Sequence, residues 1–263
     1  MREFTAEYLA TTREGMWADV RAPLEPLKLH SRDRVVDVGA GTGALTAVLR
    51  EETGGEVVAV DADPELLARA DSPQVIGDAT GLPFADASVD LAACQALLVN
   101  LPDPAAAVRE LGRVAGTVAA IEPDNAAVTV ESTVETESTL AERARELYLA
   151  GVRTDASLGA VRDLFRAAGL SGIEVRRYDH ERTVEPPYTE RDIESTRRKA
   201  SGAGLTADRA EVLAGGLSPA AFDELREQWR AMGRAAVEQM QREEYRRRET
   251  VPFYVTVGQA GEQ

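Results

Sequence analysis

The stretch Val35-Val36-Asp37-Val38-Gly39-Ala40-Gly41-Thr42-Gly43 decides the fold. Its first four residues are β-branched apart from one acid, which predicts a buried strand. Three glycines at alternate positions follow, and an apolar periodicity beginning near Ala44 predicts a helix. Glycine has no Cβ, so the backbone can turn tightly and a ligand can press against the main chain, with N–H groups of the helix pointing at it. The stretch therefore predicts a ligand site on a strand, a turn and a helix.

A second acid stands where it could bind a ribose. Val57-Val58-Ala59-Val60 predicts another buried strand, and it ends in Asp61, about twenty residues after the glycine turn. An acid at the end of the second strand can accept hydrogen bonds from the two hydroxyls of a ribose. Gly39-x-Gly41-x-x-Ala44 also satisfies the dinucleotide pattern, so an NAD(P)-dependent oxidoreductase stays an alternative.

Three features favour a ligand other than a dinucleotide. Asp37 lies two residues before the first glycine, where a carboxylate suits a cationic ligand group and would repel a pyrophosphate. Asp78-Ala79 follows the third expected strand, where a carboxylate could accept a bond from the amine of an adenine. The chain also has no Tyr-x-x-x-Lys signature, and it ends in two strands rather than in a second mononucleotide-binding half.

Outward from this stretch, short apolar runs alternate with amphipathic segments, which is typical of an α/β fold with a parallel sheet. The expected strands are Arg34–Val38, Glu56–Val60, Gln74–Gly77, Val89–Cys94, Thr117–Glu122, Ile173–Tyr178 and Pro252–Gly258. Helix starts are predicted at Asp63-Pro64, Asp103-Pro104 and Ser218-Pro219, because each pair places a capping oxygen before a proline at the first helical position. Residues 125–154 and 181–249 interrupt this alternation and are expected to be helical insertions in a single domain.

Composition excludes several classes of protein. The chain has 263 residues, 45 acidic and 30 basic, for a net charge of −15. One cysteine and two histidines exclude an intrachain disulfide and make a metal site unexpected. With no long apolar run, we expect no membrane insertion and a cytoplasmic protein. Only Lys28 and Lys199 are lysines, and together with the acidity this favours a halophilic source over GC-rich codon usage alone.

Taken together, the motifs resemble those of class I S-adenosylmethionine (SAM)-dependent methyltransferases, in particular the methyltransferase type 11 group. VVDVGAGTG at 35–43 is similar to the first motif of that family, AVDAD at 59–63 to the second, and GDATGLPFADASVDLA at 77–92 to the third with the strand after it. CQALLVNLPDPAAAVRELGRV and GTVAAIEPD continue the likeness, which covers about residues 31–124. The chain departs from the family in its short segment Arg113–Thr117 and in Asn125, where an aromatic residue is common.

The resemblance implies a Rossmann-like sheet of order 3-2-1-4-5-7-6 with an antiparallel seventh strand, and a set of cofactor-binding residues. The glycines would hold the methionine moiety of SAM, Asp61 the ribose, and Asp78 the adenine amine, while S-adenosyl-L-homocysteine would be the product. The implied cofactor-binding residues are Asp37, Gly39, Ala40, Gly41, Gly43, Asp61, Ala62, Asp78, Ala79 and Gln95. The chemistry needs no universal catalytic residue, because the sulfonium is already a good leaving group and alignment of the acceptor is the main requirement.

The acceptor side is less defined, and several functions stay open. We expect a small-molecule acceptor, enclosed by a cap made of 125–154 and 181–249 and by an N-terminal helical segment, residues 1–30. The candidate substrate contacts are Tyr8, Arg13, Trp17, Tyr148 and Tyr188, with Glu122, Asp124 and His180 as further acid–base candidates. A SAM-binding protein that acts on a macromolecule, or one without turnover, is the alternative. The basic run 242–248 is interleaved with glutamates, so a nucleic-acid partner is not expected. Monomer and homodimer both stay open.

Overall fold

The computed structural model describes residues 16–17, 21–71 and 73–261, and the chain divides into two compact units. The first unit comprises Met1–Pro123, Leu158–Tyr178 and Phe253–Gln263. The second unit comprises Asp124–Ser157 and Asp179–Pro252, which are nearly the two segments expected as insertions. Two long strands, β7 (Ser171–Val184) and β8 (Arg247–Gln259), contribute residues to both units.

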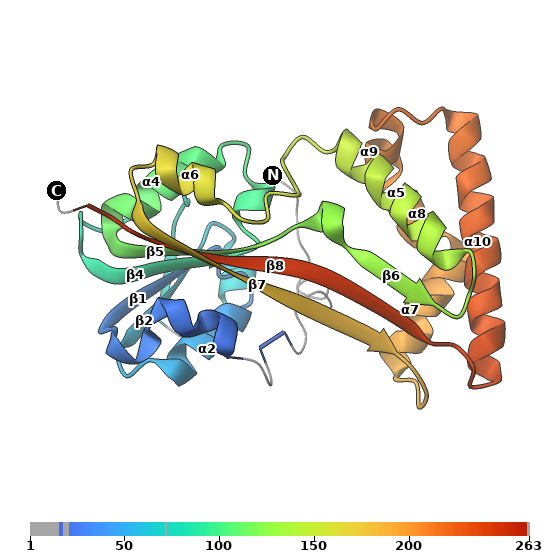
Figure 1. Cartoon of the computed structure of the whole chain (residues 1–263), viewed down its shortest axis with the longest axis horizontal. Coiled ribbons are helices and arrows are strands. Elements are labelled where there is room, and N and C mark those ends of the chain that lie inside the picture. The colour runs from blue at the N-terminus through green and yellow to red at the C-terminus, as the bar shows by residue number, and fades with distance from the viewer. Residues whose placement is uncertain (1–15, 18–20, 72, 262–263) are drawn as a thin grey trace. The chain divides into compact units, whose positions relative to one another are not determined.

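A mainly parallel sheet forms the centre of the first unit (Figure 1). Its strands are β1 (Arg34–Val38), β2 (Glu56–Asp61), β3 (Gln74–Ile76), β4 (Val89–Gln95), β5 (Ala115–Pro123), β7 and β8. The order is β3-β2-β1-β4-β5-β8, the first five strands are parallel, β8 runs antiparallel to β5, and β7 pairs with β8. The predicted Rossmann-like fold is thus confirmed, with β7 and β8 in the places of the sixth and seventh expected strands.

Helices cover the sheet, and those that begin at Ala44, Pro64 and Pro104 were predicted from the sequence. These elements are η1 (Ala22–Leu27), η2 (Leu29–Ser31), α2 (Ala44–Glu52), α3 (Pro64–Leu67), η3 (Leu98–Asn100), α4 (Pro104–Val114) and α6 (Arg162–Ala167). The Asp103 carboxylate accepts a bond from the Ala106 amide at 2.9 Å and caps α4. Leu111 of α4 and Phe165 of α6 pack in one apolar cluster with Val36 of β1, so these two helices bury the same sheet face.

The second unit is mainly helical and contains a strand that the sequence analysis did not predict. Its elements are η4 (Asn125–Ala127), β6 (Thr129–Ser132), α5 (Glu137–Gly151), α7 (Glu190–Ser201), α8 (Ala203–Ala207), α9 (Arg209–Ala214) and α10 (Pro219–Gln241). β6 pairs antiparallel with the first residues of β8, from Ser132↔Arg247 to Thr129↔Thr250. We expected helix there, at 181–184 and at 247–249, which was wrong. The strands β7 and β8 continue into these segments, and β8 extends beyond its partner β5 and offers edge groups with which β6 pairs.

An apolar stripe on α10 packs in the core of the second unit. Phe222, Leu225, Met232 and Ala236 are buried, and they share an apolar cluster with residues of α5, α8 and α9. Beside this cluster lies a buried polar network around Glu137. Its carboxylate accepts bonds from Lys199 Nζ at 2.6 Å, Tyr245 Oη at 2.8 Å and Arg247 Nε at 3.1 Å.

In the part of the chain that the structure describes, no helix has both the length and the apolarity needed to cross a membrane. The same residues contain no group of three or more His, Cys, Asp or Glu side chains arranged to hold a metal ion.

Two buried threonines on neighbouring strands differ in one hydrogen bond. The Thr256 hydroxyl of β8 has no partner among the described residues, whereas Thr117 Oγ1 of β5 lies 2.9 Å from Gln259 Oε1. We expect Thr256→Val to raise the free energy of unfolding by about 1 kcal/mol, because it removes a buried hydroxyl whose loss of hydration is not offset by a hydrogen bond. Thr117→Val is the matched control and should lower it by a similar amount. Urea denaturation measures both, and an equal loss in the two variants would contradict this account.

The buried His180 makes the second unit sensitive to acid. Burial, followed by the charge of Arg182, lowers its pKa to about 4 from an ordinary value of 6.5. Between these two pKa values the unfolded chain binds more protons than the folded chain. The free energy of unfolding is therefore highest above pH 6.5 and falls as the pH drops towards 4. Between pH 7 and pH 4.5 we expect the free energy of unfolding of His180→Phe to fall by about 1–2 kcal/mol less than that of the wild type. Denaturation at both pH values measures this, and equal losses would refute it.

Candidate functional site at the carboxyl ends of the strands

The glycine turn after β1 depends on three left-handed glycines. Gly39, Gly41 and Gly43 have φ angles of +71°, +56° and +84°. A Cβ on Gly39 would lie 2.7 Å from Leu97 Cδ1, and one on Gly43 would lie 2.9 Å from the Cα of Ala70. Only glycine satisfies both the dihedral angles and these close approaches without strain. The turn thus has the shape that the spacing of the glycines predicted.

Most of the N–H groups of this turn donate within the protein. The amides of Gly39 and Ala40 both donate to the Val60 carbonyl, at 2.8 and 3.0 Å, and the Gly43 amide donates to the Ala40 carbonyl at 2.9 Å. The Gly41 amide donates to Asp61 Oδ2 at 2.7 Å. The turn therefore offers a ligand its close-fitting main chain and an adjacent carboxylate rather than a row of vacant N–H donors.

Asp61 lies at the end of β2, half-buried, and its two oxygens are anchored by main-chain amides. Oδ2 accepts from Gly41, and Oδ1 accepts from the Asp63 amide at 2.9 Å. Each carboxylate oxygen has lone pairs for more than one hydrogen bond, so the anchored group can still accept from a diol. Ala62 follows it and is exposed.

Asp37 is buried within β1 rather than open to solvent. Its Oδ2 accepts a bond from the Thr46 hydroxyl of α2 at 2.6 Å, and only 1% of the residue is exposed. This bond ties the strand before the glycine turn to the helix after it. The binding role expected of Asp37 stays a prediction.

Asp78 and Ala79 follow β3. The exposed Asp78 uses Oδ1 to accept bonds from the Thr80 hydroxyl at 2.6 Å and the Thr80 amide at 2.8 Å, and these bonds lower the pKa of the carboxyl group. Asp78 thus caps a turn and is ionised at neutral pH. Ala79 is buried in the apolar cluster beneath the sheet ends.

Gln95 ends β4, and it contacts Met16 and Trp17 from the N-terminal part of the chain. Its Oε1 accepts a bond from the Trp17 indole at 3.3 Å, and its Nε2 lies 2.8 Å from the Met16 sulfur. Trp17 stacks on Tyr178 with ring centroids 5.3 Å apart, and the Tyr178 hydroxyl donates to the Met16 carbonyl at 2.7 Å. Residues 16–17 are therefore fastened at the carboxyl end of β4.

The substrate candidates come from different parts of the chain. Trp17 lies beside Gln95, whereas Tyr8 and Arg13 lie outside the described residues. Tyr148 and Tyr188 belong to the second unit, where both pack against its apolar cluster and the Tyr188 hydroxyl donates to the Tyr245 carbonyl at 3.0 Å. These residues stay predictions as acceptor contacts.

Two residues of this region have roles that the sequence did not reveal. Tyr178, the last residue expected in its strand, fastens Met16 and Trp17. Glu122, an acid–base candidate, is fully buried at the end of β5, where it accepts bonds from main-chain amides that follow β4. An acid closing an otherwise apolar strand was the available signal for Glu122.

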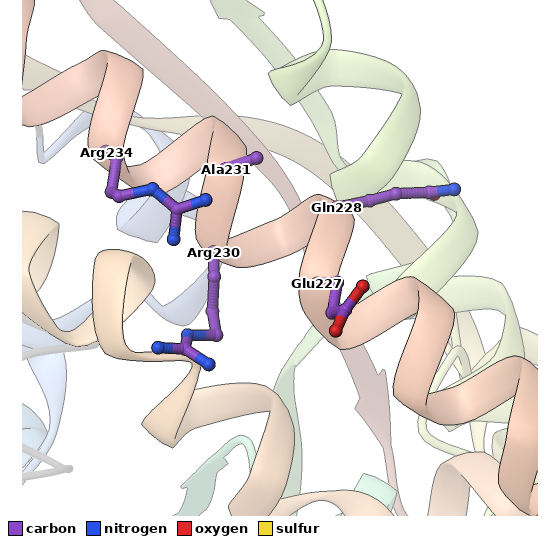
Figure 2. Close-up of a pocket in the computed structure, with 5 residues that line it drawn as sticks. All are labelled: Glu227, Gln228, Arg230, Ala231 and Arg234. Carbon is purple, nitrogen blue, oxygen red and sulfur yellow. The ribbon is translucent and has the colours of Figure 1, made fainter.

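A separate hollow lies on the surface of α10 in the second unit (Figure 2). It has a volume of about 430 Å³ and is lined by Glu227, Gln228, Arg230, Ala231 and Arg234. All five side chains are exposed and project from one helix, and none is among the predicted site residues.

Comparison with known proteins agrees with the geometry. Residues 36–118, which include the glycine turn, Asp61, Asp78 and Gln95, match the family described as methyltransferase domain. This part of the chain is a methyltransferase domain. SAM is the cofactor of this class of domain, so the predicted cofactor is confirmed. The individual residues that bind it stay predictions.

Each of the relatives by sequence matches less than half of this chain. The demethylmenaquinone methyltransferase of Mycolicibacterium vanbaalenii is 37% identical over 115 residues, which are 43% of this chain and 49% of that protein. An uncharacterized methyltransferase of Mycobacterium bovis is 48% identical over 86 residues, 31% of this chain and 35% of that one. The chain spans about half the length of the demethylmenaquinone methyltransferases that it matches.

A solved structure supports the fold over a longer stretch. The YcgJ protein from Bacillus subtilis is 16% identical, covers 92% of this chain and 99% of its own length, and gives a TM-score of 0.51. Identity this low shows a common fold alone.

The close approach at Gly43 predicts a large effect of a small substitution in the methyltransferase domain. We expect Gly43→Ala to lower the free energy of unfolding by about 2–3 kcal/mol, because a left-handed alanine costs about 1–2 kcal/mol and its Cβ would meet the backbone of Ala70. Gly54→Ala, in the same unit, is the control, since a Cβ there has no atom within 4 Å. Thermal denaturation of the two variants measures the difference, and similar losses would contradict the assignment.

Proposed function

We propose that this chain transfers a methyl group from SAM to a small-molecule acceptor by in-line displacement. The proposal rests on one observation above all, the 2.7 Å hydrogen bond from the Gly41 amide to the Asp61 carboxylate. This bond places the main chain of a left-handed glycine turn beside an anchored carboxylate at the ends of two adjacent parallel strands. A diol-bearing nucleoside that also carries a positive charge is complementary to that arrangement.

The residues present suit SAM better than a dinucleotide. A pyrophosphate needs vacant N–H donors at the turn, but the amides of Gly39, Ala40 and Gly41 already donate to Val60 and Asp61. The buried Asp37, two residues before the first glycine, adds a negative charge that disfavours a pyrophosphate at this turn. The same charge favours a sulfonium and an ammonium.

The proposed contacts follow from these positions. The glycine turn would hold the methionine moiety, Asp61 would accept bonds from the ribose hydroxyls, Ala62 would pack on the adenine, and Asp78 would accept from its amine. When bound, SAM supplies a methyl group on a sulfonium, which is a good leaving group. The protein then has to orient the donor and the acceptor and to exclude water. We expect Gln95 and Trp17, which are hydrogen-bonded to each other, to border the donor end.

The relatives support a small-molecule acceptor, but the match extends over only about half of their length. A demethylmenaquinone-like quinol is the first acceptor to test for that reason. That residues 125–154 and 181–249 cover the acceptor, and that the chain works in a salt-rich cytoplasm, stay predictions. A SAM-binding protein without turnover, or one acting on a macromolecule, is the second candidate.

Calorimetric titration tests the donor site. We expect the wild type to bind S-adenosylhomocysteine and not NAD, in 0.15 M and in 3 M KCl. Asp61→Asn should weaken S-adenosylhomocysteine binding at least about tenfold, because one acceptor oxygen becomes a donor. Asp63→Asn is the matched control, since this exposed neighbouring acid caps α3 and asparagine caps equally well. Binding of NAD in preference, or equal losses in both variants, would contradict the proposal.

Release of S-adenosylhomocysteine separates the two candidate functions. We expect product formation from SAM with a small nucleophile, beginning with a demethylated quinol and continuing through phenols, amines and thiols. The control replaces the wild type with Asp61→Asn under the same conditions. Tight binding of S-adenosylhomocysteine without turnover on any small acceptor would favour the second candidate.

A further inference from the structure

The turn that follows β4 adopts a conformation that its residues do not favour. Ala96 has a φ of +47°, in the left-handed region, although it is neither glycine nor asparagine. It lies between Gln95, at the end of β4, and Leu97, which covers the glycine turn. Strained residues of this kind persist only where the surrounding structure holds them, and they gather at functional sites.

A buried carboxylate from the neighbouring strand holds this turn. Glu122, at the end of β5, is 0% exposed. Its Oε1 accepts the amides of Leu97 at 3.1 Å and Leu98 at 3.0 Å, and its Oε2 accepts the amide of Val99 at 3.2 Å. Three consecutive N–H groups therefore donate to one carboxylate. These bonds give the amides at the start of η3 hydrogen-bond partners, and they fix the direction in which η3 leaves β4.

Two further hydrogen bonds hold Ala96 itself. Its amide donates to the Ile121 carbonyl of β5 at 2.9 Å, and its carbonyl accepts from Asn100 Nδ2 at 2.8 Å. The strained residue is thus held from both sides, by β5 and by the end of η3.

The turn in this conformation contacts the proposed cofactor site. Leu97 packs on Gly39, whose missing Cβ leaves the space that the leucine side chain fills. Gln95, one residue before the strained position, presents its amide to Trp17 and Met16. A change in the Ala96 dihedral angles would therefore move Leu97 against the glycine turn and Gln95 away from its partners.

We propose that Glu122 is a positioning residue for cofactor binding, which acts by holding the turn at 95–100 in its left-handed conformation. The inference rests on the proposed function, because the turn borders the site assigned to SAM. Glu122 touches neither the cofactor nor the acceptor in this account. It differs from an ordinary buried carboxylate in that its bonds hold a strained turn beside the site.

The first test compares two buried glutamates by calorimetry with S-adenosylhomocysteine. Glu122→Gln keeps the volume but replaces one acceptor oxygen with an NH₂ group that faces an amide donor. We expect about tenfold weaker binding. Glu137→Gln is the matched control, because Glu137 is an equally buried and hydrogen-bonded carboxylate in the second unit. It should lose thermal stability while its affinity stays within about twofold of wild type.

A second substitution separates positioning from general stability. Glycine adopts the left-handed region without strain, so Ala96→Gly should hold the turn with less help from Glu122. We expect Ala96→Gly to improve the affinity of Glu122→Gln more than it changes that of the wild type. Weak binding by Glu122→Gln that Ala96→Gly does not improve would overturn the proposal, and so would wild-type affinity in Glu122→Gln.

A third measurement uses no ligand. Hydrogen exchange followed by NMR should show faster exchange of the Leu97, Leu98 and Val99 amides in Glu122→Gln, with the amides of β5 unchanged. Equal protection in both proteins would overturn the proposal.

If Glu122→Gln does not fold, Asn100→Ala replaces it. This variant should bind about threefold more weakly than the wild type, and Asn125→Ala, which removes a similar amide-to-carbonyl bond in the second unit, should not.

An unchanged affinity in Asn100→Ala would likewise overturn the proposal. The affinity of the wild type for S-adenosylhomocysteine distinguishes a failure of the proposed function from a failure of the role assigned to Glu122. If it does not bind S-adenosylhomocysteine, the proposed function itself fails. If the wild type binds and Glu122→Gln binds equally well, the function stands and only the role of Glu122 fails.

Discussion

The hydrogen bond between the Gly41 amide and the Asp61 carboxylate links the two elements on which the site depends. It is possible only because β1 and β2 are parallel and in the register that pairs Val38 with Val60, so that the glycine turn and the acid leave the sheet at the same edge. The amides of the left-handed Gly39 and Gly41 then donate to the Val60 carbonyl and the Asp61 carboxylate. The sheet register, the positions of the glycines and the position of the carboxylate are thus all required by one constraint, the close approach of this turn to β2.

The same constraint explains which ligand suits the domain. When the turn donates its amides to its own protein, it gives up the donors that a phosphate would need and retains a negative charge beside a snugly folded main chain. Asp37 adds a second charge from beneath, and its bond to Thr46 keeps α2 against the strand. The arrangement therefore favours a cationic nucleoside over a dinucleotide, although the glycine spacing alone is compatible with both.

Much of this could be predicted from the sequence because its signals are local. The apolar runs gave β1 to β5 within about two residues, and Asp103 with Pro104 gave the start of α4. Asp90, near the start of β4, accepts hydrogen bonds from the amides of Asp33 and Arg34 beside it. Such residues act on neighbours in the chain or in the adjacent strand, so spacing and residue type are sufficient to place them.

The parts that could not be predicted depend on contacts between distant segments. β6 is a short Thr-Val-Glu-Ser segment that becomes a strand only because β8 extends far enough to pair with it. Glu122 lies 25 residues from Leu97, and Trp17 lies 78 residues from Gln95. No apolar periodicity or motif predicts such pairs. The sequence around Glu122 also does not distinguish a carboxylate that binds a substrate from one that holds a turn.

A crystal structure of the protein with S-adenosylhomocysteine is the most direct measurement of the central claim. We predict that the ribose hydroxyls lie within hydrogen-bond distance of Asp61, that the amino-acid end lies along the turn at 39–43, and that the adenine lies near Asp78. A ligand bound elsewhere, or a ribose that makes no contact with Asp61, would contradict the account.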